Sequence, residues 1–165
     1  MGQALTLTTP SDREIAITRE FAAPRRLVFD AFVKPNLVRR WLLGPSGWTM
    51  PVCEIDFRVG GRYRFVWRRD SDGTEMGMGG VYREIAPPER LVATELFDED
   101  WTGGEVVSTI VLTEHEGRTT LANTALYASK EGRDGALASG MMRGVEASYD
   151  RLDEVLASPS TGGSK

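Results

Sequence analysis

Six apolar residues near the C-terminus recur at steps of three or four, the spacing that places side chains on one face of an α-helix. They are Leu137, Met141, Val145, Tyr149, Leu152 and Leu156. The pattern predicts one long helix from about Lys130 to Ala157, and its apolar stripe must be buried against the rest of the chain. Gly140 and Gly144 lie near the stripe, and each weakens a helix by ~1 kcal/mol relative to alanine. We therefore expect these glycines to let another segment approach the helix closely.

The segments before this helix alternate apolar and polar residues, as strands do when one face is buried. They are "REIAITREF", "VCEIDF", "RYRFVWRR", "MGMGGVYREI", "RLVATELF", "VVSTIVLTEH" and "RTTLANTALY". Two short helices follow the first of them, with Pro24 in the first turn of one and Pro35 opening the other. We predict an α+β fold in which a curved, seven-stranded antiparallel sheet wraps around the C-terminal helix. Such an arrangement commonly leaves a cavity between sheet and helix.

Two hairpin turns predict which residues lie opposite each other. A three-residue loop at 59–61 would pair Phe57 with Tyr63, Ile55 with Phe65 and Cys53 with Trp67 on the inner face, and Asp56 with Arg64 on the other. A turn at Glu116–Gly117 would pair Leu112 with Leu121 and Ile110 with Asn123. The amide of Asn123 then lies on an apolar face, where it needs a partner from protein, water or ligand.

Length and composition indicate one globular domain. The 165 residues suit a single core, which we place at residues 13–157 between small, polar tails at 1–12 and 158–165. A net charge of −4, from 20 basic and 24 acidic residues, gives no reason to expect a nucleic-acid partner. A single cysteine, Cys53, is typical of a reducing compartment. Since no segment has the roughly 20 apolar residues that span a bilayer, and no signal peptide is evident, we expect a cytoplasmic protein without a membrane partner.

Few residues offer catalytic or metal chemistry. His115 is the one histidine, and it sits between Glu114 and Glu116 at a predicted hairpin tip, where solvated turn residues are the simpler interpretation. Cys53 should point inward, where apolar surroundings raise the pKa of a thiol and make it inert. We therefore expect no catalytic set, no bound metal and no cofactor.

The aromatic stripe of the interior is the remaining candidate site. We predict that the ligand-binding site is lined by Tyr63, Phe65, Trp67, Asn123, Met141 and Val145, with Trp41 and Trp48 at its mouth. The two tryptophans enclose the turn "LLGPSG", which either anchors the loop or forms a mobile lid. We expect Trp41 to be a packing anchor and Trp48 to be freer to move. Trp101, in an acidic loop, could fold over the opposite side of the mouth.

Four strings carry a family resemblance: "REFAAPRRLVFDAFVKP", "RRWLLGPSGWTMPVCEIDFRVGGRYRFVW", "GVYREIAPPERLVATE" and "YDRLDEVLA". They resemble SRPBCC domains of the branch named after the activator of Hsp90 ATPase, within the helix-grip (START-like, Bet v 1-like) superfamily. The resemblance implies the helix-grip fold over nearly the whole domain. It does not identify any residue of this chain as catalytic.

The resemblance leaves three functions open, because members of the superfamily include lipid and polyketide binders, cyclases and co-chaperone-like domains. The first, which we favour, is binding of a small hydrophobic or aromatic molecule in the interior. The second is a cyclase- or hydrolase-type enzyme, which needs an interior titratable group such as Tyr63, Tyr82, Tyr149 or Glu95. The third is a protein-interaction domain. A homodimer is also left open.

Overall fold

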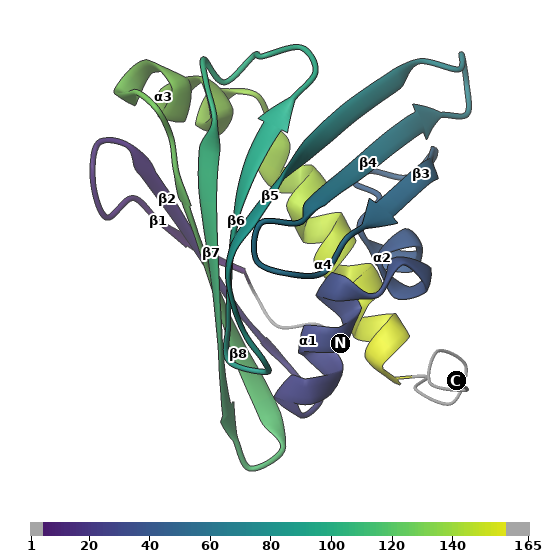
Figure 1. Ribbon diagram of the computed structural model, residues 1–165, viewed down its shortest axis with the longest axis vertical. Helices are drawn as coiled ribbons and strands as arrows, with labels where there is room; N and C mark the ends of the chain where they lie inside the picture. The colour runs from purple at the N-terminus through teal and green to yellow at the C-terminus, as the bar shows by residue number, and fades with distance from the viewer. Residues whose placement is uncertain (1–4, 158–165) are drawn as a thin grey trace.

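The computed structural model describes residues 5–157 (Figure 1). In chain order its elements are β1 (Thr6–Thr8), β2 (Glu14–Phe21), α1 (Arg25–Val33), α2 (Pro35–Trp41), β3 (Trp48–Ile55), β4 (Arg62–Arg69), β5 (Glu75–Ala86), β6 (Arg90–Phe97), β7 (Val106–His115), β8 (Arg118–Leu126), α3 (Lys130–Ala138) and α4 (Met141–Ala157). The strands form one antiparallel sheet in the order β1-β2-β8-β7-β6-β5-β4-β3. This is the α+β helix-grip architecture that we expected.

The sheet bends around α4. Figure 1 shows β1, β2, β8 and β7 on one side and β4 and β3 on the other, with α4 running obliquely between them. The backbone of α4 packs most closely against α2. Contact between α4 and the sheet therefore depends on side chains, and their size determines how well the interior is filled.

The sheet has eight strands, not the seven that we predicted. The additional strand, β1, lies in the segment expected to be a flexible tail, and it forms the edge of the sheet by pairing with β2 through Thr6–Thr18 and Leu7–Ile17. All three β1 residues are exposed. The strand therefore lacks the buried residues on which a prediction from apolar alternation depends. The tail predicted at 158–165 lies outside the described residues.

The single helix predicted at 130–157 is wrong: the structure has two helices, α3 and α4, separated by Ser139 and Gly140. Gly140 has a φ of +82°, in the left-handed region that favours glycine and commonly ends a helix. The apolar spacing continues across the break from Leu137 to Met141, so periodicity could not reveal it. Gly144 meets the expectation of a close approach, because a Cβ added there would lie 3.4 Å from Cδ of Pro45. The same expectation is wrong for Gly140, because nothing lies within 4 Å of a Cβ added there.

One predicted hairpin register is confirmed and the other is wrong. Leu112 lies opposite Leu121 and Ile110 opposite Asn123, as the Glu116–Gly117 turn predicts. Between β3 and β4, however, Ile55 lies opposite Tyr63, Cys53 opposite Phe65 and Glu54 opposite Arg64. The register is shifted by two residues because the loop is longer, with Gly60 donating a backbone hydrogen bond to Tyr82 of β5 at 2.8 Å. A shift of two keeps the strand side chains on their predicted faces, but Phe57, predicted opposite Tyr63, lies in the loop and is 37% exposed.

The shift also changes the predicted ion pairs on the outer face. Asp56 pairs with Arg58 inside the loop at 3.0 Å. Arg64, which we predicted to pair with Asp56, instead forms a bidentate pair with Asp98, at 2.8 and 2.7 Å. The charged outer face thus ties β4 to the end of β6 and needs no external partner to balance it.

Candidate ligand-binding site

The interior is solidly packed at the end where α1 and α2 meet the second half of α4. Phe21, Leu121 and Leu152 have no exposed surface, and Trp41 is 1% exposed. The Trp41 indole donates a hydrogen bond to the Ala31 carbonyl at 2.8 Å. Its ring also packs against Phe32 and Tyr149, with centroids 4.8 and 5.9 Å away. Trp41 is therefore the packing anchor that we expected.

The other end of the interior is less completely buried. Seven residues of the inner sheet face and the helices remain half-buried there: Glu95 and Phe97 on β6, Asn123 and Ala125 on β8, Leu137 on α3, and Met141 and Val145 on α4. We call this set the half-open end. Its hydrophobic members pack against the core but keep some exposed surface, so solvent reaches these inward side chains.

The predicted site residues divide between a buried wall and the half-open end. Tyr63, Phe65 and Trp67 are buried side by side on β4, with successive ring centroids 5.0 and 6.0 Å apart. The Trp67 indole donates to the Leu42 carbonyl at 2.7 Å, which fixes its orientation. Asn123, Met141 and Val145 belong to the half-open end. Of the residues predicted at the mouth, Trp41 lies in the solid end instead.

Trp48 begins β3 and is half-buried. It lies opposite Arg69, whose guanidinium carbon is 5.4 Å from the ring centroid, a cation–π arrangement. This contact holds the indole toward β4.

The turn between the two tryptophans is anchored to α4. The Gly44 amide donates to the Ser148 hydroxyl at 2.8 Å, and Arg151 donates to the Gly44 carbonyl at 2.7 Å. Pro45 packs against Gly144, where the missing side chain makes room for it. These contacts support the anchored-loop interpretation over the mobile lid.

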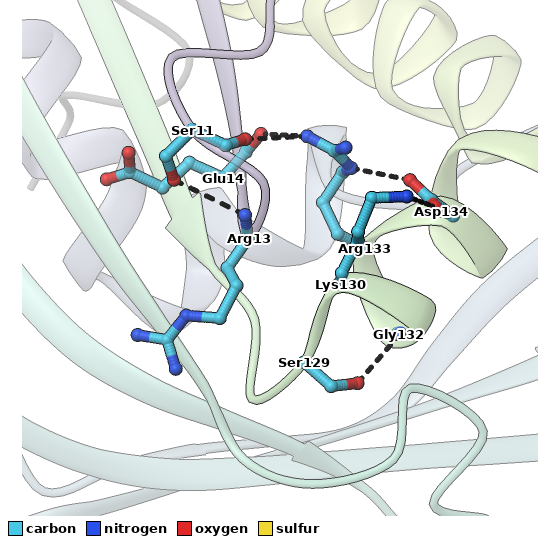
Figure 2. Close-up of polar contacts among 8 residues, drawn as sticks. All are labelled: Ser11, Arg13, Glu14, Ser129, Lys130, Gly132, Arg133 and Asp134. Carbon is cyan, nitrogen blue, oxygen red and sulfur yellow. Dashed lines mark hydrogen bonds and ion pairs between the residues drawn. The ribbon is translucent and has the colours of Figure 1, made fainter.

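A second set of contacts fixes α3 at the rim of the half-open end (Figure 2). The guanidinium of Arg133 is buried and donates to the backbone carbonyls of Ser11 and Glu14, at 2.7 and 3.2 Å. The Ser129 side chain caps α3 by accepting from the Gly132 amide at 3.0 Å. Arg133 thus attaches α3 to the turn between β1 and β2 and to the start of β2.

The loop between β6 and β7 completes the rim. Its Thr102 carbonyl lies against Gly132 of α3, where a Cβ would have no room. Trp101 is 45% exposed and packs against Phe97 of the half-open end, with ring centroids 5.4 Å apart. Trp101 therefore stands at the edge of the half-open end.

Glu95 is the one carboxylate of the half-open end. It lies on the inner face of β6, opposite the buried Val106. Burial raises the pKa of its carboxyl from 4.5 to about 7, because removal from water disfavours the charged form. The sequence analysis named Glu95 only as an acid for a hypothetical enzyme. The alternation of Leu91, Ala93 and Glu95 along β6 is the signal that would have placed it inside.

Three tyrosines lie within electrostatic range of Glu95. Burial, with a contribution from the Glu95 charge, raises the pKa of Tyr127 to about 12 and that of Tyr63 far above its usual range. The pKa of Tyr149 also rises to about 12 by burial; Asn123 opposes this by hydrogen bonding, while the Glu95 charge adds to it. Sequence reasoning did not assign Tyr127 to the site, although it ends the strand predicted at 118–127 and continues the inward alternation of Asn123 and Ala125.

Asn123 and Tyr127 have polar partners within the protein. Ser108 donates to the side-chain oxygen of Asn123 at 3.1 Å, which supplies the partner that the Asn123 amide needed. The Tyr127 hydroxyl lies 3.8 Å from the Met141 sulfur, a weak acceptor. These contacts orient Asn123 and Met141 along the inner wall.

Two surface hollows lie elsewhere on the molecule. A groove of about 440 Å³ runs between α1, β3 and the Pro87–Pro88 turn, lined by apolar residues such as Phe29 and Phe57. A hollow of about 650 Å³ lies on the outer face of β3 to β6 and is lined largely by charged residues such as Arg62 and Asp98. The groove beside α1 is thus an apolar alternative to the half-open end.

The residues considered for metal or thiol chemistry lie apart. His115 is 87% exposed at the tip of the β7–β8 hairpin, and Cys53 is buried, with burial raising the pKa of its thiol. Within residues 5–157, no three metal-ligating side chains gather at one place, and no helix is long and apolar enough to cross a membrane.

Comparison with known proteins identifies a family and several structural neighbours. The family model for "Activator of Hsp90 ATPase homolog 1-like protein" matches residues 22–157. A crystal structure of a protein from Rhodobacter sphaeroides is 34% identical, covers 93% of this chain and 99% of its own, and has a TM-score of 0.87. A protein from Chromobacterium violaceum is 27% identical over 87% of this chain and 96% of its own, with a TM-score of 0.73.

A third structure, of a protein from Nitrosomonas europaea, shares the fold at 23% identity. It covers 92% of this chain and 98% of its own, with a TM-score of 0.80. No protein of curated function matches the sequence.

Proposed function

Because the chain belongs to the family of Activator of Hsp90 ATPase homolog 1-like proteins, we propose that it binds a small hydrophobic or aromatic molecule between the curved sheet and α4. The observation that carries the proposal is the uneven filling of the interior. One end has side chains with no exposed surface, while inward side chains of the half-open end remain accessible. The lipid- and polyketide-binding members of the helix-grip superfamily support the same function by analogy.

The chemistry of the walls suits such a ligand. Phe65, Trp67 and Phe97 offer aromatic surface, and Met141 offers a flexible thioether that adapts to irregular shapes. A few polar groups, among them Asn123, accompany this apolar surface, as is usual in small-molecule sites. The ligand would lie against Ala125 and Val145, with Trp101 at the edge.

A pair of substitutions on β8 tests the proposal. Ala125→Phe adds a ring on the inner face at the half-open end, whereas Ala122→Phe adds the same ring on the outer face of the same strand. We expect calorimetric titration with naphthalene-based probes to show at least a tenfold weaker affinity for Ala125→Phe and an unchanged affinity for Ala122→Phe. Circular dichroism would establish that both variants are folded. Equal affinities in two folded variants would refute an interior site.

A further inference from the structure

We propose that the Glu95 carboxylate is the polar anchor of the half-open end, and that the ligand is a hydrophobic amine whose cationic nitrogen pairs with it. This inference rests on the proposed function and goes beyond it by naming the chemical class of the ligand. It assigns to Glu95 a binding role, and no step of bond making or breaking.

The position of Glu95 carries the inference. Its side chain lies on the inner face of β6, opposite Val106, and is half-buried. Within residues 5–157, no protein group donates a hydrogen bond to this carboxylate, and burial is the sole cause that acts on its titration. Interior carboxylates are ordinarily paired or hydrogen-bonded. An interior carboxylate that keeps some accessible surface and has no partner among the described residues is available to a ligand.

The groups near Glu95 favour a cation over an anion. The Glu95 charge contributes to the raised pKa values of Tyr63 on β4, Tyr127 after β8 and Tyr149 on α4, so all three lie within its electrostatic range. The Tyr63 hydroxyl already donates to the Thr94 carbonyl at 2.6 Å, so it does not neutralise the carboxylate. Aromatic faces attract cations through their quadrupole. An anionic ligand would instead meet the charge of Glu95 in a poorly solvated place.

The buried cation Arg19 pairs with other carboxylates. Its guanidinium on β2 pairs with Asp150 and Asp153 of α4, at 2.9 and 2.6 Å. Arg19 therefore links β2 to α4, and within residues 5–157 its ion pairs do not include Glu95.

The titration of Glu95 gives the inference a pH signature. With a pKa of about 7, the carboxyl is mostly protonated near pH 6 and mostly ionised near pH 8. An ammonium ligand binds the ionised form, so its affinity should rise about tenfold between these pH values. An uncharged ligand of the same shape should show little change.

Matched probes test the inference: 1-naphthylmethylamine, which is cationic at these pH values, and 1-naphthylmethanol, which is neutral. We expect calorimetry near pH 8 to show the amine binding at least tenfold more tightly than the alcohol. Glu95→Gln, which keeps the side-chain shape, should reduce this preference to less than twofold. Glu89→Gln, a change at an exposed turn residue, should keep the full preference.

The outcomes separate this inference from the proposed function. If both probes bind wild-type protein equally, or if Glu95→Gln keeps the preference for the amine, the role of Glu95 is refuted while interior binding stands. If neither probe binds at millimolar concentration, the proposed function fails and this inference fails with it. Should Glu95→Gln not fold, the wild-type pH dependence decides: an amine affinity that is flat between about pH 6 and pH 8 refutes the inference.

Discussion

Glu95 is the residue at which stability and binding oppose each other. An ionised carboxylate that loses water without gaining a partner destabilises the folded state. The raised pKa of Glu95 means that the folded protein holds a proton which the unfolded chain releases at lower pH. The buried, unpaired carboxylate of Glu95 therefore weakens the folded protein at neutral and basic pH.

This opposition gives a prediction with a definite sign. Since the folded pKa of about 7 lies above the unfolded value of 4.5, stability associated with Glu95 is present below about pH 4.5 and is lost as the pH rises through 7. We expect Glu95→Gln to exceed wild type in free energy of unfolding by about 1–3 kcal/mol near pH 8, and by much less near pH 5. Urea denaturation at both pH values measures this. A difference between the variants that does not change with pH would contradict it.

At the scale of elements, the break between α3 and α4 depends on the backbone of Gly140. An alanine there must adopt a φ of +82°, so Gly140→Ala should lower the free energy of unfolding by about 1–2 kcal/mol. The control is Gly135→Ala, because Gly135 lies inside α3 with open space around its Cα. That change should raise stability by about 0.4–1 kcal/mol. Thermal unfolding of the two variants compares them, and a stabilising Gly140→Ala would show that the helices are not broken as described.

The strands also show which structural features could be predicted from sequence patterns. Alternation along β4 predicted that Tyr63, Phe65 and Trp67 point inward, because side-chain direction depends only on odd and even positions. The register between β3 and β4 was not predictable in this way, since it depends on a loop that bonds to a third strand, β5. Likewise, the half-open end was only partly predicted. Asn123, Met141 and Val145 lie on regular stripes, whereas Glu95 was not assigned to the binding site and the loop carrying Trp101 is placed by contacts with α3.

At the scale of the whole molecule, the interior has a solid end that supports the fold and a half-open end where we propose that a ligand binds. This division predicts that leucine-to-alanine substitutions lower the free energy of unfolding by different amounts at the two ends. Leu152→Ala removes a side chain with no exposed surface and should lower the free energy of unfolding by about 3–5 kcal/mol. Leu137→Ala, at the half-open end, should lower it by about 1–2 kcal/mol, since that side chain keeps some contact with solvent. Urea denaturation gives both values, and equal losses would mean that the interior is uniformly packed.

The central claim is that a ligand binds in the interior, and locating a bound apolar ligand tests it most directly. Intermolecular nuclear Overhauser effects between 1-naphthylmethylamine and the protein's methyl groups locate it without substitution. An interior site predicts contacts to the methyl groups of Ala125, Met141 and Val145. Contacts confined to Val33 and Ile55, which line the groove beside α1, would contradict the account.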